Sequence, residues 1–110
     1  MICDFCDVVV VPFPFVDLAA AKRRPSLVLS HASFNDSHGH SICAMITTAA
    51  GSTWPSDVAI GDLKLAGLNR PCVVRWKLFT LPNSAILKRA GKLASHDQSN
   101  VITVVRNIMG

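Results

Sequence analysis

The chain has 110 residues, of which 50% are hydrophobic and 16% are charged, and its formal net charge is +4. This size predicts one domain over residues 1–110 with a core of its own, and the composition excludes a disordered chain. No run of about 18 apolar residues occurs, and Asp4 and Asp7 stand where a signal peptide carries basic residues. We therefore expect a cytoplasmic protein with no membrane span.

The positive charges are clustered along the chain. They fall at Lys22–Arg24, Arg70–Lys77 and Lys88–Lys92. Clustered cations indicate an anionic partner, and the alternative is a solvated basic face. The large hydrophobic fraction also leaves apolar surface for self-association.

The first half of the chain predicts three strands. The β-branched run Val8–Val11 predicts a strand that ends near Pro12, and Pro25–Ser30 predicts a second, with a basic loop between them. Residues 31–41 are rich in turn-forming side chains and predict a mobile surface loop. Ile42–Thr48 predicts a third, buried strand.

The second half predicts two more strands and then helices. A short strand is expected at Asp57–Ile60 and a strand long enough to cross a barrel at Cys72–Leu78, with a turn or short helix at 63–68 between them. Helix is expected around Asn83–Arg89 and again from Ser95, where Ser95 and Gln98 have the spacing of a capping box. This order predicts a mainly β chain with appended helices, an α+β fold around a small, partly open antiparallel barrel.

The cysteines and histidines do not form a metal-binding pattern. Cysteines at positions 3, 6, 43 and 72 supply one Cys-x-x-Cys pair but no second pair for structural zinc. We expect free, mostly buried thiols and no metal or other cofactor, although Cys3 and Cys6 near the terminus could oxidise or bind metal adventitiously. His38 and His40 have no third ligand at suitable spacing.

Ordered sequence blocks run through nearly the whole chain. The most specific one extends from Asp7 to Phe15 and continues through Asp17-Leu18 into Lys22–Ser30. Later blocks are Ala44–Thr48, Ser56–Val58, Ala66–Leu68 with Pro71, Lys77–Leu81 and Gly91–Leu93. Together they resemble the MazF/PemK family of toxins. The resemblance implies an SH3-like barrel of the MazF/CcdB type with a C-terminal helix, assembled as a homodimer that binds a cognate antitoxin.

The resemblance also implies an activity, namely metal-independent, sequence-selective cleavage of single-stranded RNA in a groove across the dimer. The 2′-hydroxyl of RNA is its own nucleophile, so the protein need only align it, stabilise charge on the phosphorane and allow proton transfer. The matching positions are Arg24 and Thr47. Arginine offers a permanently charged, planar fork for phosphate oxygens, and a strand-end threonine offers a hydroxyl donor.

Further residues are expected to bind RNA around this pair. Thr48 is the alternative to Thr47 and points to the opposite face of its strand. Lys22 and Arg23 are candidate phosphate contacts, and Phe15 is a candidate base-stacking residue, although Phe13 and Phe15 could equally be core or dimer contacts. Trp76 could line the groove or close the barrel wall. The complete set of expected RNA-binding residues is Phe15, Asp17, Lys22, Arg23, Thr48, Arg75 and Lys77.

Two positions depart from the family pattern. The usual glycine before the first strand's Asp7 is Cys6 here, so a turn that glycine makes easily must be made by a residue with a Cβ. Some relatives carry an acidic residue where this chain has Arg75 and Trp76, which argues against an acid–base role for a carboxylate there. These departures keep open the alternative of a catalytically idle remnant. The apolar and basic surface keeps open a second alternative, a non-catalytic SH3-like toxin that binds a protein target such as gyrase.

Overall fold

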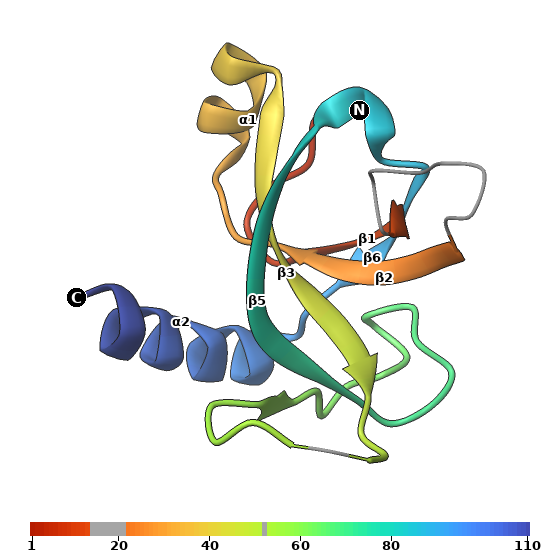
Figure 1. The fold of residues 1–110 in the computed structure, drawn as a ribbon, viewed down its shortest axis with the longest axis vertical. Coiled ribbons are helices and arrows are strands. Elements are labelled where there is room, and N and C mark those ends of the chain that lie inside the picture. The colour runs from red at the N-terminus through yellow and green to blue at the C-terminus, as the bar shows by residue number, and fades with distance from the viewer. Residues whose placement is uncertain (14–21, 52) are drawn as a thin grey trace.

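The computed structural model describes residues 1–13, 22–51 and 53–110 (Figure 1). Within these residues, six strands form one antiparallel sheet in the order β4-β5-β3-β2-β1-β6. The strands are β1 (Asp7–Phe13), β2 (Lys22–Val28), β3 (His40–Thr48), β4 (Val58–Ala59), β5 (Cys72–Pro82) and β6 (Lys88–Lys92). The helices are α1 (Ala32–His38), the 3₁₀ turn η1 (Asn83–Ala85) and α2 (Ser95–Met109).

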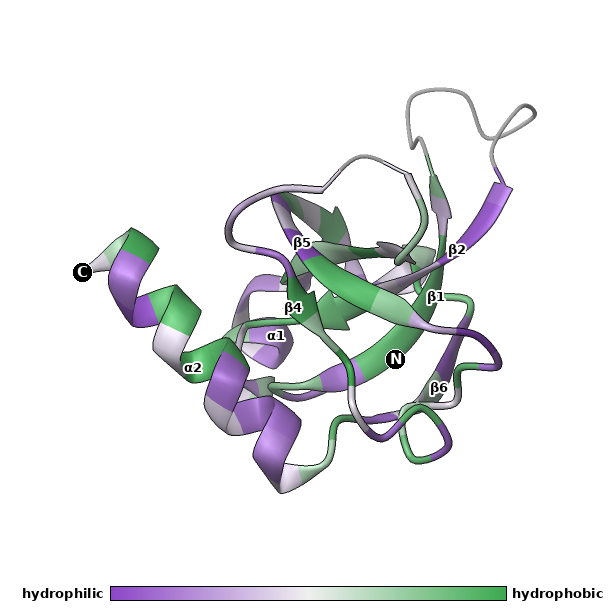
Figure 2. Cartoon of the chain, turned by 90° about the horizontal axis from the view of Figure 1, so that it is seen from below, coloured by the Kyte–Doolittle hydropathy of each residue, from purple (hydrophilic) through white to green (hydrophobic). Residues whose placement is uncertain are grey.

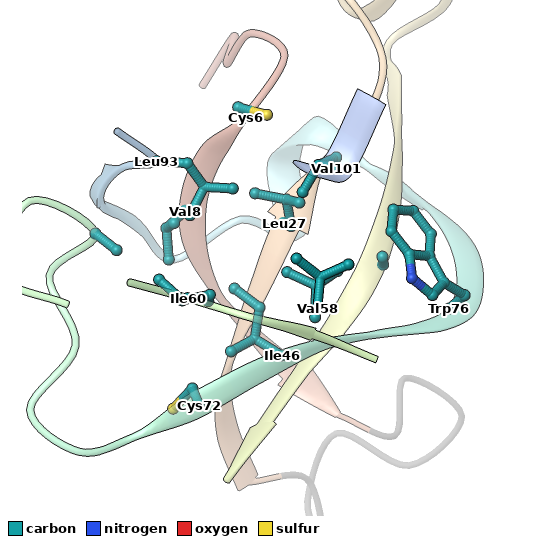
Figure 3. Close-up of a cluster of buried hydrophobic side chains, with 13 residues drawn as sticks. Cys6, Val8, Leu27, Ile46, Val58, Ile60, Cys72, Trp76, Leu93 and Val101 are labelled. Carbon is teal, nitrogen blue, oxygen red and sulfur yellow. The ribbon is translucent and has the colours of Figure 1, made fainter. Parts of the chain in front are cut away.

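The sheet curls into a half-barrel, and strand alternation gives it two buried faces. On one face, here called the α2 face, Val8, Leu27, Ile46 and Trp76 belong to one buried cluster with Val101 of α2 (Figure 3). The other, the η1 face, carries a second cluster made of Cys3, Val9, Val11, Val28, Cys43, Leu81 and Ile86. Figure 2 shows the hydrophobic strands at the centre of the molecule and alternating colours along α2. The predicted mainly β half-barrel with a C-terminal helix is therefore confirmed.

Residues 31–41 are not a mobile loop, as the sequence predicted, but helix α1 followed by the start of β3. The reason is a buried polar network centred on Asn35, whose side chain is fully buried. Its amide nitrogen donates to the backbone oxygens of Cys3 at 2.9 Å and Ser30 at 3.1 Å. Its backbone oxygen accepts from the side chain of Asn83 at 2.7 Å. These long-range contacts stabilise a helix that turn-forming residues alone do not predict.

The predicted helix around Asn83–Arg89 is also wrong, since only η1 is helical and β6 follows it. The edge of β1 accounts for the difference, because Lys88–Lys92 pairs with it from Asp7↔Lys92 to Val10↔Lys88. Buried Asp7 strengthens this pairing through ion pairs with Arg89 at 3.3 Å and Lys92 at 3.5 Å.

Two smaller predictions also fail. Lys22–Arg24 do not form a loop but begin β2, where they pair with Val11–Phe13 of β1. No capping box forms at Ser95, because Ser95 is already helical and Gln98 donates its side-chain amide to Leu93 O at 2.8 Å. Instead, buried Asp97 accepts the backbone N–H groups of Gly61 and Asp62 and so joins α2 to the loop after β4.

The turn at 63–68 lies against β6 at a close backbone approach. Gly67 has φ +75°, and a Cβ there would stand 2.2 Å from Ala90 O. A Cβ on Gly91 would stand 2.3 Å from Leu65 O. Two separate blocks of the family-like sequence thus meet in space, and each brings the glycine that the contact requires.

All four cysteines are buried and free. Burial raises the pKa of the Cys6 and Cys43 thiols to about 12, so both stay protonated and unreactive. Cys6 adopts φ +66°, the left-handed conformation for which glycine is best suited. In the described ranges no three His, Cys, Asp or Glu side chains gather as metal ligands. Those ranges also contain no helix long and apolar enough to cross a membrane.

Candidate functional site

The candidate site lies where β2 and β3 separate. Their pairing runs from Val28↔Cys43 to Ser26↔Met45 and ends there, next to Pro25, which has no N–H to donate. Beyond this point β2 continues along β1, from Arg24↔Val11 to Lys22↔Phe13. Figure 1 shows the start of β2 and the end of β3 diverging from this point. The separation opens a space between two strand ends.

A pocket of about 350 Å³ occupies this space. Strand β2 contributes Arg23, Arg24 and Pro25, and β3 contributes Ile46, Thr47 and Thr48. The wall is completed by Leu68, Asn69, Arg70 and Cys72. The structure therefore brings Arg24 and Thr47 together, as well as Arg23 and Thr48. With three arginines, two hydroxyls and no carboxylate among its described lining residues, the pocket suits an anion.

The two strands offer different residues to the two faces of the sheet. If the register of Ser26↔Met45 is continued, Arg24 stands opposite Thr47 and Arg23 opposite Thr48. Alternation then assigns Arg24 and Thr47 to the η1 face, and Arg23 and Thr48 to the α2 face. Ile46 and Cys72, which also line the pocket, belong to the core cluster of the α2 face, so the lining draws on both faces of the sheet. Arg24 is exposed and Thr47 half-buried, so both side chains have access to a ligand from solvent.

Arg75 and Lys77 lie in β5, away from this pocket's lining. The Arg75 fork binds Asp57, with Nε 3.1 Å from Oδ1 and Nη2 2.8 Å from Oδ2. This pairing holds the pKa of the Asp57 carboxyl below its usual value. Arg75 is 11% exposed, and its guanidinium is engaged in the protein rather than directed at solvent. The carboxylate that some relatives carry in this strand is thus replaced by the basic half of an internal ion pair.

The other described residues predicted for the site lie outside the lining of the pocket. Trp76 is buried and donates Nε1 to Ser56 O at 2.7 Å, so it closes the barrel wall. Phe13 is half-buried, with its ring 5.9 Å from that of Phe79. Lys22 is exposed at the start of β2, where Figure 2 shows a hydrophilic strand end. Phe15 and Asp17 lie outside the described residues.

Two residues of interest were not singled out from the sequence. Arg70 lines the pocket, and its only sequence signal is its place in a cluster of cations. Trp54 is 39% exposed and lies against two cations, with Arg75 Cζ at 5.8 Å and Lys77 Nζ at 5.5 Å from the ring centroid. It belongs to a loop with no periodic pattern, so no sequence signal identifies it.

The half-barrel with a C-terminal helix is the fold of solved toxin structures. A MazE–MazF complex from Deinococcus radiodurans (Form-III) aligns with TM-score 0.79 and 20% identity, over 100% of this chain and 98% of that chain. An endoribonuclease bound to its cognate antitoxin, from a mycobacterial species, aligns with TM-score 0.75 and 16% identity, over 99% of this chain and 94% of that chain. The Mycobacterium tuberculosis toxin MazF-mt6 aligns with TM-score 0.74 and 20% identity, over 94% of this chain and 95% of that chain.

The sequence defines the family more narrowly than the fold does. Residues 4–109 match the model of the PemK-like, MazF-like toxins of type II toxin-antitoxin systems. The chain therefore belongs to the PemK/MazF family of toxins, as its sequence blocks suggested. No curated protein sequence matches the chain significantly.

Proposed function

We propose that this toxin is an endoribonuclease that cleaves single-stranded RNA in the pocket between β2 and β3. The observation that carries the proposal is a pocket in which Arg23, Arg24 and Thr47 from two separated strand ends meet Arg70 from the segment before β5. Such a pocket attracts the phosphate backbone of RNA. Family membership and the similar structure described as an endoribonuclease support this assignment.

In the proposed reaction the RNA supplies the nucleophile. The 2′-oxygen forms a bond to phosphorus and loses its proton, the bond from phosphorus to the 5′-oxygen breaks, and that oxygen gains a proton. The products are a 2′,3′-cyclic phosphate and a 5′-hydroxyl. The guanidinium N–H groups of Arg24 donate hydrogen bonds to the phosphorane oxygens, where charge increases in the transition state. Thr47 adds a hydroxyl donor. Catalysis then rests on positioning and charge stabilisation.

We propose the partners on chemical and family grounds. Arg23, Lys22 and Arg70 bind flanking phosphates and so set affinity more than rate. The similar toxin structures solved with antitoxins support a cognate antitoxin as partner. Exposed apolar side chains such as Leu78 and Ile108 support a homodimer. We propose the cytoplasm as the place where the toxin acts.

Purified protein incubated with RNA in excess EDTA tests the activity. We expect cleavage that Arg24→Ala abolishes and that Thr47→Val slows by roughly 100-fold or more, the cost of one lost transition-state donor. Arg24→Lys should also be slow, because it keeps the charge but loses the fork. The matched controls are Thr80→Val, an exposed strand threonine, and Arg106→Ala, an exposed arginine of α2.

Two results would contradict the proposal. One is the absence of cleavage by the wild type, or cleavage that requires a divalent ion. The other concerns the protein-binding alternative: if Arg24→Ala stops RNA cleavage but still inhibits growth, the toxin acts on another target.

A further inference from the structure

Trp54 presents an exposed aromatic ring beside two cations. The side chain is 39% exposed, although tryptophan in a domain of this size usually contributes to the core. Its ring lies against the guanidinium of Arg75 and the ammonium of Lys77, at 5.8 and 5.5 Å. Cations near the ring favour its present orientation, while more than a third of the residue's surface stays exposed to solvent.

The turn that carries Trp54 is held firmly to the sheet. Within it, Asp57 N donates to Trp54 O, and Trp54 N donates to Asp57 Oδ2, each at 3.0 Å. Outside it, the Asp57 carboxylate accepts from Arg75 Nε and Nη2, and Ser56 O accepts from Trp76 Nε1. These contacts hold the turn against β5, and the two cations lie against the Trp54 ring, so a ligand has less of this segment to order.

The sheet register relates Trp54 to the proposed catalytic pair. In β5, Val73 is opposite Thr47 and Arg75 is opposite Met45. Arg75 and Thr47 are therefore diagonal neighbours on the η1 face, a separation of about 7–8 Å between their backbones in regular sheets. Since the Trp54 ring lies against Arg75, it lies beside the face of the sheet to which alternation assigns Arg24 and Thr47.

We propose that Trp54 is a base-stacking site for a nucleotide that flanks the cleaved bond, an inference that rests on the proposed ribonuclease function. Single-stranded RNA offers an aromatic face with every base, and stacking on a protein ring is tolerant of sequence. Lys77, exposed beside the ring, is placed to bind the phosphate of the stacked nucleotide. Arg75 serves as a positioning residue, because its fork already binds Asp57.

Binding of an uncleavable RNA tests this site without relying on turnover. The probe is a fluorescein-labelled 2′-O-methyl RNA with the sequence that the wild type cleaves, and its affinity is measured by anisotropy. We expect Trp54→Ala and Trp54→Leu to weaken binding about tenfold or more, and Trp54→Phe to change it less than about threefold. Phe34→Ala is the matched control, since Phe34 is 37% exposed on α1, and it should bind like the wild type.

The outcomes separate stacking from a structural role. If Trp54 only covers the Arg75–Asp57 pair, Trp54→Ala lowers the melting temperature and leaves RNA affinity unchanged, which overturns the proposal. A Trp54→Phe variant that binds as weakly as Trp54→Leu overturns it as well. Should Trp54→Ala fail to fold, the comparison of the Leu and Phe variants decides. A wild type that neither binds nor cleaves RNA instead refutes the proposed function itself.

Discussion

Cys6 holds a conformation that costs free energy for any residue with a Cβ. At φ +66° its N–H donates to Val28 O at 2.7 Å and its carbonyl accepts from Leu93 N at 3.0 Å, so two neighbouring segments fix the turn. The left-handed conformation costs a residue with a Cβ roughly 1–2 kcal/mol. The thiol offsets part of this cost, because it is fully buried in the core cluster of the α2 face.

Two variants isolate the free-energy cost of the left-handed backbone at position 6. Both Cys6→Ala and Cys6→Gly remove the sulfur, but only glycine also relieves the strained backbone. We expect the free energy of unfolding of the glycine variant, measured by urea denaturation, to be about 1 kcal/mol larger than that of the alanine variant. An alanine variant as stable as the glycine variant would show that the turn stores no strain.

Asp57 makes stability depend on pH in the acid range. Its pKa is lowered, first through the hydrogen bonds from Arg75, below the ordinary value of 3.8. A carboxyl with a depressed folded-state pKa stabilises the protein above the unfolded-state pKa and loses this contribution as pH falls through the folded-state value. We therefore expect the wild type to exceed Asp57→Asn in free energy of unfolding by the largest amount at pH 7. This difference should decrease below about pH 4. Thermal melts from pH 2.5 to 7 measure it, and a gap that stays constant with pH would contradict this assignment.

At the scale of elements, α1 is held to the sheet by amide groups more than by apolar contacts. Asn35 bridges Cys3, Ser30 and Asn83, and Asn83 also accepts from Ser41 Oγ at 2.7 Å. Replacing Asn35 by leucine leaves buried carbonyls without a donor, which should lower the free energy of unfolding by roughly 2–3 kcal/mol. Urea denaturation measures the loss, with Asn100→Leu on the exposed side of α2 as the control. A loss equal to that of the control would mean that the network contributes nothing net.

The elements that the sequence predicts correctly are those whose own residues determine them. The Val8–Val11 run, Ile42–Thr48 and the helix from Ser95, which carries Val101, Val104 and Val105, have their apolar patterns in their own residues. Their strands and helix form as expected. In contrast, α1 and β6 depend on distant partners. Asn35 acts through contacts with Cys3 and Asn83, and β6 forms because the edge of β1 is available to it. Such long-range contacts leave no signal in a short window of sequence.

The whole molecule determines which side chains meet in the site, and the sequence reveals this only in part. Arg24 and Thr47 are selected by resemblance to the family, and the separation of β2 from β3 brings them to one pocket. Arg70 reaches the same pocket from the segment before β5, which local patterns do not predict. Arg75, which the sequence predicts to bind RNA, forms an ion pair with Asp57, and Asp57 faces it because β4 pairs with β5.

The net charge of +4 and the site's arginines together predict how RNA binding responds to salt. Each phosphate that the protein neutralises releases counterions, and for single strands the slope of log K against log salt changes by about 0.7 per contact. Arg70 is exposed and lines both the pocket and the adjoining hollow of Thr48, Ala49, Ala50 and Pro71. Under the proposed function, we expect an arginine in this position to neutralise a phosphate beside the one that Arg24 binds.

Removing Arg70 should therefore weaken RNA binding at low salt and also flatten its salt dependence. We expect Arg70→Gln to reduce the slope by about 0.7 and to weaken all RNA sequences alike, because a phosphate contact does not read bases. Arg106→Gln removes the same charge from α2, outside the pocket lining, and should leave the slope unchanged. Equal slopes for the two variants would mean that overall charge, not the pocket, attracts the RNA. A slope reduced only in Arg70→Gln assigns that attraction to the space between β2 and β3.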